Sequence, residues 1–258
     1  MLAAAPGGVL PCGAQEPVPL VVGVVGAAPG LPASPAELFS ALAKEARPQW
    51  RQYFRGTVLH AGQDRFQLAL SLGAVCADCY LAAEARDAQQ VLNLLTDMAS
   101  LEMSLSIARQ AGGARQKFTE LAEAGDWAGV RTEIRALMTV HEQSFAAQQD
   151  DLLAELERTG LWLRAFHIGS RYSSRQPPPP GAWTPAMFAA LQQSVARVVA
   201  GHESKTLKTL SAGLESLHKT WSGSAPAADN VAGTLKTLDT LMVELIGDTP
   251  ATTPGSTP

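Results

Sequence analysis

The stretch from Trp162 to Arg175 combines residue types that can recognise an anion. Three arginines and a histidine are spaced three, four and four residues apart, and aromatic residues flank them, so a helix would gather them on one side. A guanidinium group bonds a carboxylate through two N–H groups and stacks on aromatic rings. We therefore predict a site for an anionic partner, and the alternative is a solvated basic face with inward-packed rings. The predicted site residues are Arg164, His167, Arg171, Arg175, Trp162 and Tyr172.

A second set of residues would suit a metal ion or haem in a helical bundle. Carboxylate-bridged di-iron bundles need two Glu-x-x-His pairs and two further glutamates. The chain has one such pair, in Glu215-Ser216-Leu217-His218, and His141 falls on the apolar face of another predicted helix. We expect no cofactor and hydrogen-bonded core histidines. The alternative is a metal or haem bound by His141, His218 and Glu215.

Cys76-Ala77-Asp78-Cys79 forms a CxxC motif inside an apolar stretch. A redox-active pair needs its first cysteine at a helix N-terminus, and this one lies within a predicted helix. A zinc site needs more ligands, and Cys12 is the only other cysteine. We predict buried core cysteines, with a local disulfide as the alternative, because residues i and i+3 share a helix face.

Asp78 is an acidic residue in the middle of the same apolar stretch. A buried carboxylate needs a partner, and the simplest one is an arginine from a neighbouring helix. We therefore expect an ion pair rather than a catalytic carboxylate at this position.

Motifs of common enzyme classes are missing from the sequence. It contains no GxSxG, no GxxxxGK[ST], no GxGxxG after a strand and no HExxH. This favours a non-catalytic role.

The elements that must position these residues are predicted to be helices almost throughout. Helix starts are predicted at the capping box Ser34-Pro35-Ala36-Glu37, at Asp64, at Asp87 and at Asp126. We expect Gly112-Gly113 to end one helix before a shorter one over 114–124. Apolar positions recur at spacings of three and four in several segments, which is typical of helices with one buried face. These stripes include Val91, Leu94, Leu95, Met98 and Leu101; Val130, Ile134, Leu137, His141 and Phe145; and Leu207, Leu210, Leu214, Leu217 and Trp221.

The predicted fold class is all-α, with about eight or nine helices packed as antiparallel hairpins in a bundle or a short tetratricopeptide-like array. Proline-rich and polar stretches divide the chain. The expected parts are a leader or disordered apolar arm over 1–33, a helical-hairpin domain over 34–176, a proline linker over 177–184, C-terminal helices over 185–248 and a Thr/Pro tail over 249–258.

Two internal similarities bear on this organisation. The segment 83–91 resembles 122–130, and each places an aspartate where one helix ends and the next begins. Thr206–Leu210 recurs identically as Thr234–Leu238. The pattern of Ala69, Leu72, Gly73 and Cys76 is similar to part of the tetratricopeptide motif, without its large aromatic residues. Chance similarity in an alanine-rich helical chain is the alternative.

Three segments, 68–91, 125–127 and 160–164, resemble exported all-helical bacterial proteins of unassigned function. The resemblance covers about half of the chain and includes no catalytic motif. It implies a helical fold and export, and no reaction.

The first residues suit export. Leu2–Leu10 is apolar, and Cys12 and Ala14 offer small residues before a cleavage site, but no Lys or Arg precedes them, as in a truncated leader. We predict export to the periplasm or cell envelope. The alternative is an apolar arm, which in a peripheral envelope protein would contact the membrane.

Overall charge and hydropathy narrow the partners. The chain of 258 residues has 20 Lys+Arg and 24 Asp+Glu, a net charge of −4, which removes the electrostatic argument for nucleic acid. No apolar stretch reaches about 18–20 residues, so we expect no membrane span. The predicted function is that of a non-catalytic exported scaffold or binding protein, whose groove takes a protein, a peptide or a small anionic partner.

Overall fold

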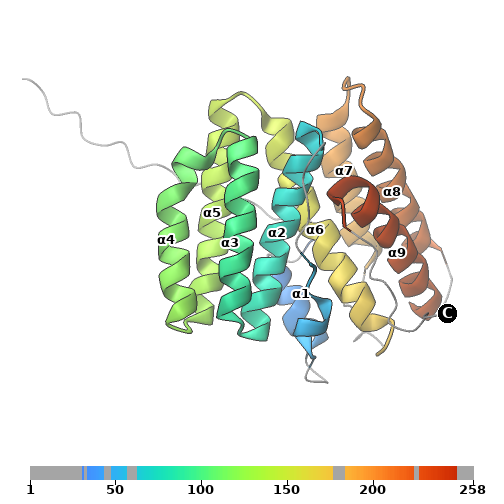
Figure 1. The fold of residues 1–258 in the computed structure, drawn as a ribbon. Helices are drawn as coiled ribbons and strands as arrows, with labels where there is room; N and C mark the ends of the chain where they lie inside the picture. Colours follow the sequence, from blue (N-terminus) through green and yellow to red (C-terminus); the bar gives the residue numbers. More distant parts are fainter. Residues whose placement is uncertain are drawn as a thin grey trace, which may run out of the picture.

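The computed structural model describes residue 31 and residues 34–43, 48–56, 63–176, 184–223 and 227–248. Within these ranges the chain contains nine α-helices and no strand, which confirms the all-α prediction (Figure 1). The elements are α1 (Pro35–Leu42), the 3-10 helix η1 (Trp50–Tyr53), α2 (Arg65–Ala85), α3 (Ala88–Ser104), α4 (Ala108–Glu123), α5 (Trp127–Ala147), α6 (Asp151–Ser173), α7 (Pro185–Val199), α8 (Lys205–Ser222), α9 (Ala227–Leu241) and the π-helix η2 (Met242–Ile246).

Helices α2 and α6 form the centre of the protein and pack along each other (Figure 1). They cross closely at two glycines. A Cβ atom on Gly73 would overlap the carbonyl oxygen of Glu157, and one on Gly160 would overlap that of Leu70. The absence of both side chains lets the two backbones touch, so that residues from both helices share one core.

By length and composition alone, the central helix α2 is long and apolar enough to cross a membrane, contrary to the expectation from the sequence. Inside this protein, 83% of its 18-residue apolar window is buried. A buried core helix of a globular protein can have the same length and apolar composition as a membrane span.

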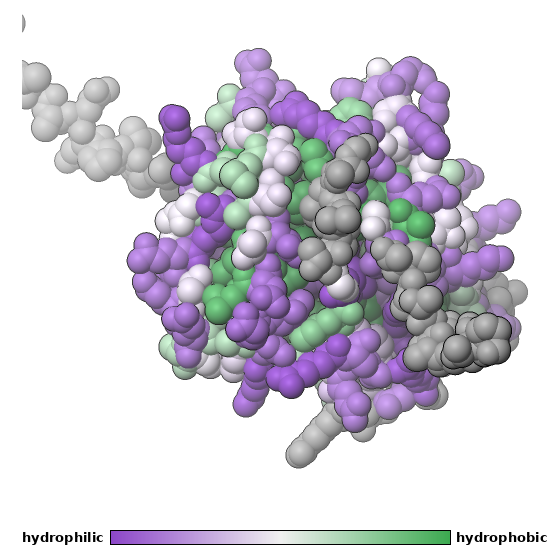
Figure 2. Space-filling view, in the orientation of Figure 1, coloured by the Kyte–Doolittle hydropathy of each residue, from purple (hydrophilic) through white to green (hydrophobic). Residues whose placement is uncertain are grey.

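Figure 1 shows α3, α4 and α5 on one side of this central pair and α7, α8 and α9 on the other, while α1 packs against α2 and α6. The predicted stripes of α3, α5 and α8 are all buried, which confirms these faces. Hydrophilic side chains cover much of the face seen in Figure 2, with hydrophobic side chains visible between them. Among the described residues, Met103 and Val243 are the exposed large hydrophobic side chains.

Aspartates begin three of the helices, as predicted. Asp64 forms a capping box with Gln67, in which the Gln67 backbone N–H donates to Asp64 Oδ1 at 2.8 Å. The Asp87 side chain accepts a hydrogen bond from the backbone N–H of Gln90, and the Asp126 side chain accepts one from the backbone N–H of Gly129. At Ser34 the helix starts where expected, but the serine side chain makes no capping hydrogen bond.

The two similar segments, 83–91 and 122–130, form the same turn. Arg86 and Gly125 each adopt the left-handed conformation, with φ of 53° and 72°, and an N-cap aspartate follows each of them. Ser106 and Gln149 take the same conformation in the other turns between α3 and α6. Helices α2 to α6 are therefore joined by four turns that each contain one residue with positive φ. A residue in this conformation ends one helix and lets the next begin within a few residues. The tetratricopeptide-like character of these hairpins stays a prediction.

The predicted helix break at Gly112-Gly113 is wrong. Helix α4 runs through both glycines, and the break lies earlier, at Ser106. Each interior glycine costs about 1 kcal/mol relative to alanine. Burial of Ala111, Phe118 and Ala122 on the inner face of α4 offsets that cost.

The predicted leader or arm over 1–33, apart from residue 31, lies outside the described residues, as do most of the linker and the tail over 249–258. Helices α7 and α9 pack on α6, so the C-terminal helices lie beside the first ones.

Candidate functional site

Asp78 of α2 binds two arginines in the interior. Its Oδ1 accepts from Arg164 Nε of α6 at 2.8 Å, and its Oδ2 accepts from Arg55 Nε at 2.7 Å. The side chains of Arg164 and Asp78 are only 2% and 4% exposed, and this confirms the expected ion pair. Burial would raise the pKa of Asp78, but the two guanidinium groups outweigh it and lower the pKa.

Arg164 is held at each of its three nitrogens. Nη2 donates to the carbonyl oxygen of Tyr53 at 2.7 Å, and Nη1 lies 2.9 Å from His167 Nδ1. Burial lowers the pKa of Arg164, and Asp78 opposes that effect. All these partners belong to the protein, so Arg164 stabilises the junction of α2, α6 and η1.

His167 connects this junction to the surface. Its Nε2 lies 2.8 Å from Asp239 Oδ1 of α9. Burial lowers its pKa to about 4, a shift that Asp239 opposes and that the charges of Arg164 and Arg171 increase. Arg171 Nε donates to the same Nε2 at 3.0 Å, so each ring nitrogen faces an arginine, and at neutral pH the ring is uncharged.

Arg171 and Asp239 form the outer end of this network. Arg171 Nη2 donates to Asp239 Oδ1 at 3.0 Å, and their side chains are 38% and 45% exposed. The hydrogen bond from His167 lowers the pKa of Asp239, burial opposes that shift and Arg171 adds to it. We call Arg55, Asp78, Arg164, His167, Arg171 and Asp239 the arginine cluster.

Arg55 has one nitrogen that this cluster does not use. Its Nε and Nη2 bind Asp78, whereas its Nη1 is buried and meets no acceptor among the described residues. Sequence reasoning missed Arg55, because it follows a short aromatic segment with no periodicity that would mark a buried charge.

The remaining predicted site residues are distributed between core and surface. The Trp162 ring packs against that of Phe166, and the Tyr172 ring against that of Trp50. Both tryptophan and tyrosine are buried. Arg175 is exposed and donates to the side-chain oxygen of Gln52. The structure thus places the other predicted residues on α6 and Arg175 in the turn just after it, and of the six only Arg171 and Arg175 reach solvent.

A groove of about 370 Å³ adjoins this exposed end of α6. It is lined by Pro48, Gln49, Trp50, Arg51, Gln52, Glu84 and Ala85. Among these lining residues, Gln52 contacts Arg175 and Trp50 contacts Tyr172, so two predicted site residues border the groove. We call it the η1 groove. Its volume lies within the range of about 300–1,000 Å³ that ligand pockets typically have.

A second groove, of about 630 Å³, lies between α8 and α9. Small and hydroxyl side chains line it, including Gly213, Ser216, Thr220, Gly233 and Thr237. None of the predicted site residues contributes to its lining.

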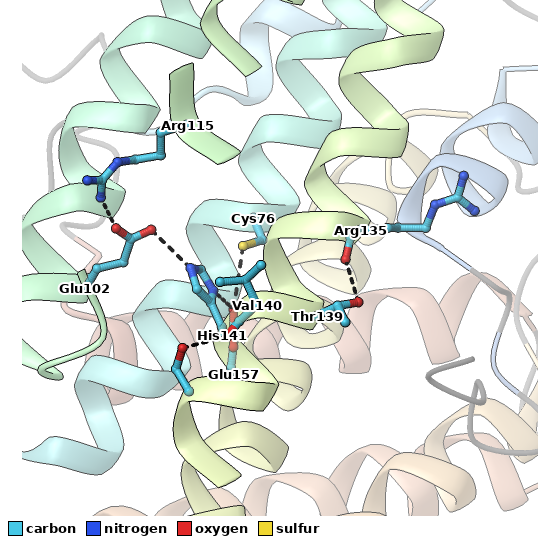
Figure 3. A network of polar contacts seen from close by, with 9 residues as sticks. Cys76, Glu102, Arg115, Arg135, Thr139, Val140, His141 and Glu157 are labelled. Carbon is cyan, nitrogen blue, oxygen red and sulfur yellow. Dashed lines mark hydrogen bonds and ion pairs between the residues drawn. The ribbon is translucent and has the colours of Figure 1, made fainter. Parts of the chain in front are cut away.

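A separate buried cluster surrounds His141 (Figure 3). Its Nδ1 lies 2.7 Å from Glu157 Oε1, and its Nε2 lies 3.0 Å from Glu102 Oε1. Arg115 pairs with the other oxygen of Glu102, and Cys76 Sγ contacts Glu157 Oε1. Both ring nitrogens thus face carboxylate oxygens, and His141 of α5 links Glu102 of α3 to Glu157 of α6.

The residues of the alternative metal or haem site lie on different helices. His141 is enclosed by its two glutamates, His218 Nδ1 lies 2.8 Å from Gln192 Oε1, and Glu215 is exposed. The carboxylates of Glu102 and Glu157 are on opposite sides of the imidazole ring, where one ion cannot reach both. Within the described part of the chain, no three His, Cys, Asp or Glu side chains are placed to hold a metal ion.

Cys76 and Cys79 are free, buried thiols, as predicted. Burial raises the pKa of both thiols well above the usual value, and nearby carboxylates add to the effect. Both therefore remain protonated, unreactive core side chains at neutral pH.

Comparison with known proteins finds no matching family model, no similar curated protein and no similar solved structure. The resemblance to exported helical bacterial proteins therefore stays a prediction.

Proposed function

We propose that this protein is a non-catalytic helical binding protein whose η1 groove takes an acidic segment of a peptide or protein partner. Arg175 carries this proposal. It is an exposed cation at the edge of the groove, and the side chains that it hydrogen-bonds, Gln52 and Tyr53, are neutral. No carboxylate pairs with Arg175 in the described part of the chain, so its charge is available to an acidic ligand.

The groove offers further polar groups beside this charge. Arg51 is 70% exposed and paired with Asp87, and Gln49 adds an amide. Glu84, the acidic residue in the lining, is already paired with Arg131. Trp50 supplies an aromatic wall. Cations, amides and one ring in a shallow groove favour an extended peptide with acidic side chains.

The rigid core beneath the groove supports a binding role. The arginine cluster ties η1 and the adjoining Arg55 to α2 and α6 through Asp78 and Arg164. A site held in this way loses little conformational entropy on binding. Cys76 and Cys79 are buried, protonated thiols, and the buried ring of His141 is bonded to two glutamates. This supports a role without catalysis.

Export to the periplasm or cell envelope is part of the proposal. It rests on the leader-like pattern of the first 16 residues, and N-terminal sequencing of the protein from cell fractions tests it.

A binding titration tests the groove directly. The full chain is titrated into fluorescein-labelled hexaglutamate, and anisotropy is recorded at low salt. We expect saturable binding that Arg175→Gln weakens about tenfold, in line with the loss of a charge-assisted hydrogen bond. The matched control is Arg109→Gln, because Arg109 is exposed on α4, away from the groove. Equal losses in both variants would indicate attraction to net charge and would overturn the site.

A further inference from the structure

Arg55 presents a buried cationic donor that the fold leaves unused. Its side chain is only 8% exposed, and Nε and Nη2 both bind Asp78 Oδ2. The N–H groups of Nη1 are buried and have no acceptor among the described residues. Buried polar groups are almost always paired, and a charged donor is the costliest to leave alone. An unpaired guanidinium nitrogen at this depth therefore points to an acceptor from outside.

The neighbouring carboxylates of the cluster are already engaged. Both oxygens of Asp78 are occupied, by Arg164 and Arg55. Asp239 Oδ1 receives His167 and Arg171. Within the cluster, three arginines face two aspartates and a neutral histidine. This leaves an excess of one positive charge.

Asp248 is the carboxylate that balances this charge from a distance. It lies in the field of Arg55, Arg164, Arg171 and Asp78, yet no ion pair joins it to them in the described ranges. Burial raises its pKa, although the arginines oppose that shift. Asp248 is thus a counter-ion without direct contact to the arginines.

The backbone places Asp248 at the end of a short segment. Helix η2 packs on α2, and Gln67 Nε2 donates to the carbonyl oxygen of Glu244 at 3.0 Å. Gly247 then turns the chain with φ of 76°, and the Asp248 N–H donates to the carbonyl oxygen of Met242 at 3.0 Å. A single glycine turn therefore sets the position of the Asp248 carboxylate relative to the arginines.

We propose that Arg55 Nη1 is a second binding site, separate from the η1 groove, which takes one singly charged carboxylate in competition with Asp248. The charge excess of one selects a monoanion over a phosphate dianion. The guanidinium edge favours the planar geometry of a carboxylate. Asp248 weakens binding while it is ionised, and its protonation or neutral substitution relieves the competition.

Acetate and inorganic phosphate are the probes for this site. Side-chain Nε and Nη signals of arginine are followed by ¹⁵N NMR on the full chain, with Arg55 assigned through Arg55→Lys. We expect acetate to shift the Arg55 signals saturably and phosphate to shift them less. We also expect Asp248→Asn to bind acetate about tenfold more tightly than the parent chain, since one competing charge is removed. Asp229→Asn, on the exposed face of α9, is the control and should bind acetate as the parent does.

The outcomes separate the parts of this proposal. If acetate leaves the Arg55 signals unchanged in both the parent and Asp248→Asn, the site is overturned. If acetate binds equally to these two chains, the competition with Asp248 is overturned. Stronger binding of phosphate would contradict the single-charge selection. Asp248 lies beyond the buried residues of η2, and the acetate affinities of the parent and Asp248→Asn are read from the arginine side-chain signals that saturate, so this comparison does not require Arg55→Lys to fold.

Discussion

Asp78 on α2 and Arg164 on α6 form an ion pair between two almost completely buried side chains, with 2.8 Å between Oδ1 and Nε. The pair sits in the contact between the two central helices, and Arg164 also holds the backbone of Tyr53. A buried charge with a missing partner is far more costly than the pair is favourable.

Removal of one partner of this pair should therefore destabilise the whole protein. We predict that Asp78→Asn lowers the free energy of unfolding by about 3–5 kcal/mol, because it leaves Arg55 and Arg164 without their carboxylate. Urea denaturation followed by circular dichroism measures this value. Lys208→Ala, which breaks an exposed pair with Glu203, should cost less than about 1 kcal/mol. Similar losses in both variants would show that the buried pair has no special role.

The pKa of Asp78 also gives this pair a pH dependence. Because its folded-state pKa is lowered, the contribution is present above the ordinary pKa of an aspartate and is lost as the pH falls through the lower folded value.

His167 should make stability depend on pH in a higher window. Its pKa is about 4 in the folded protein against 6.5 for the free side chain. Between these values the unfolded chain binds a proton that the folded chain does not, so the free energy of unfolding falls as the pH drops from about 6.5 to 4. His167→Gln should flatten this part of the profile. An identical slope in the variant and the parent chain would assign the dependence to other groups.

The close crossing of α2 and α6 should tolerate no side chain at its glycines. We predict that Gly73→Ala and Gly160→Ala each destabilise the protein by about 3 kcal/mol or more, since a Cβ would meet the backbone of the facing helix. Gly113→Ala is the matched control on α4, where the added methyl group meets nothing within 4 Å. It should stabilise the protein by about 0.5–1 kcal/mol. Thermal unfolding of the three variants distinguishes steric clash from helix propensity.

The cluster around His141 should depend on the two contacts of its ring with carboxylates. In His141→Leu, the buried carboxylates of Glu102 and Glu157 lose the ring that lies between them, and we expect a loss of about 3–5 kcal/mol in the free energy of unfolding. The double variant His141→Leu/Glu157→Gln removes one of the stranded charges and should recover part of this loss. If the double variant is less stable than the single one, packing rather than charge governs the site.

Local patterns predicted the helices and their buried faces well. The stripes of α3, α5 and α8 and the caps at Asp64, Asp87 and Asp126 follow from spacing and side-chain chemistry within a few residues. The break at Gly112-Gly113 failed, because tertiary packing of Phe118 and its neighbours overrides a weak local preference.

The candidate site was harder to predict from the sequence. Spacing places Arg164 and His167 on one face of α6, but it does not reveal that α2 and α9 cover that face. The kind of partner for Asp78 was predictable from the cost of burying a charge, whereas its identity, 86 residues away, depends on the fold. Arg55 and Asp239 belong to the site only through such long-range contacts.

Mapping the bound peptide is the most direct test of the η1 groove as the binding site. The indole N–H of Trp50, assigned through Trp50→Phe, and the Nε–H of Arg175 are followed by NMR while unlabelled hexaglutamate is added to the full chain. The account predicts that these two signals shift together and saturate. Saturating shifts confined to residues of the groove between α8 and α9, or no saturable shift at Trp50 and Arg175, would contradict it.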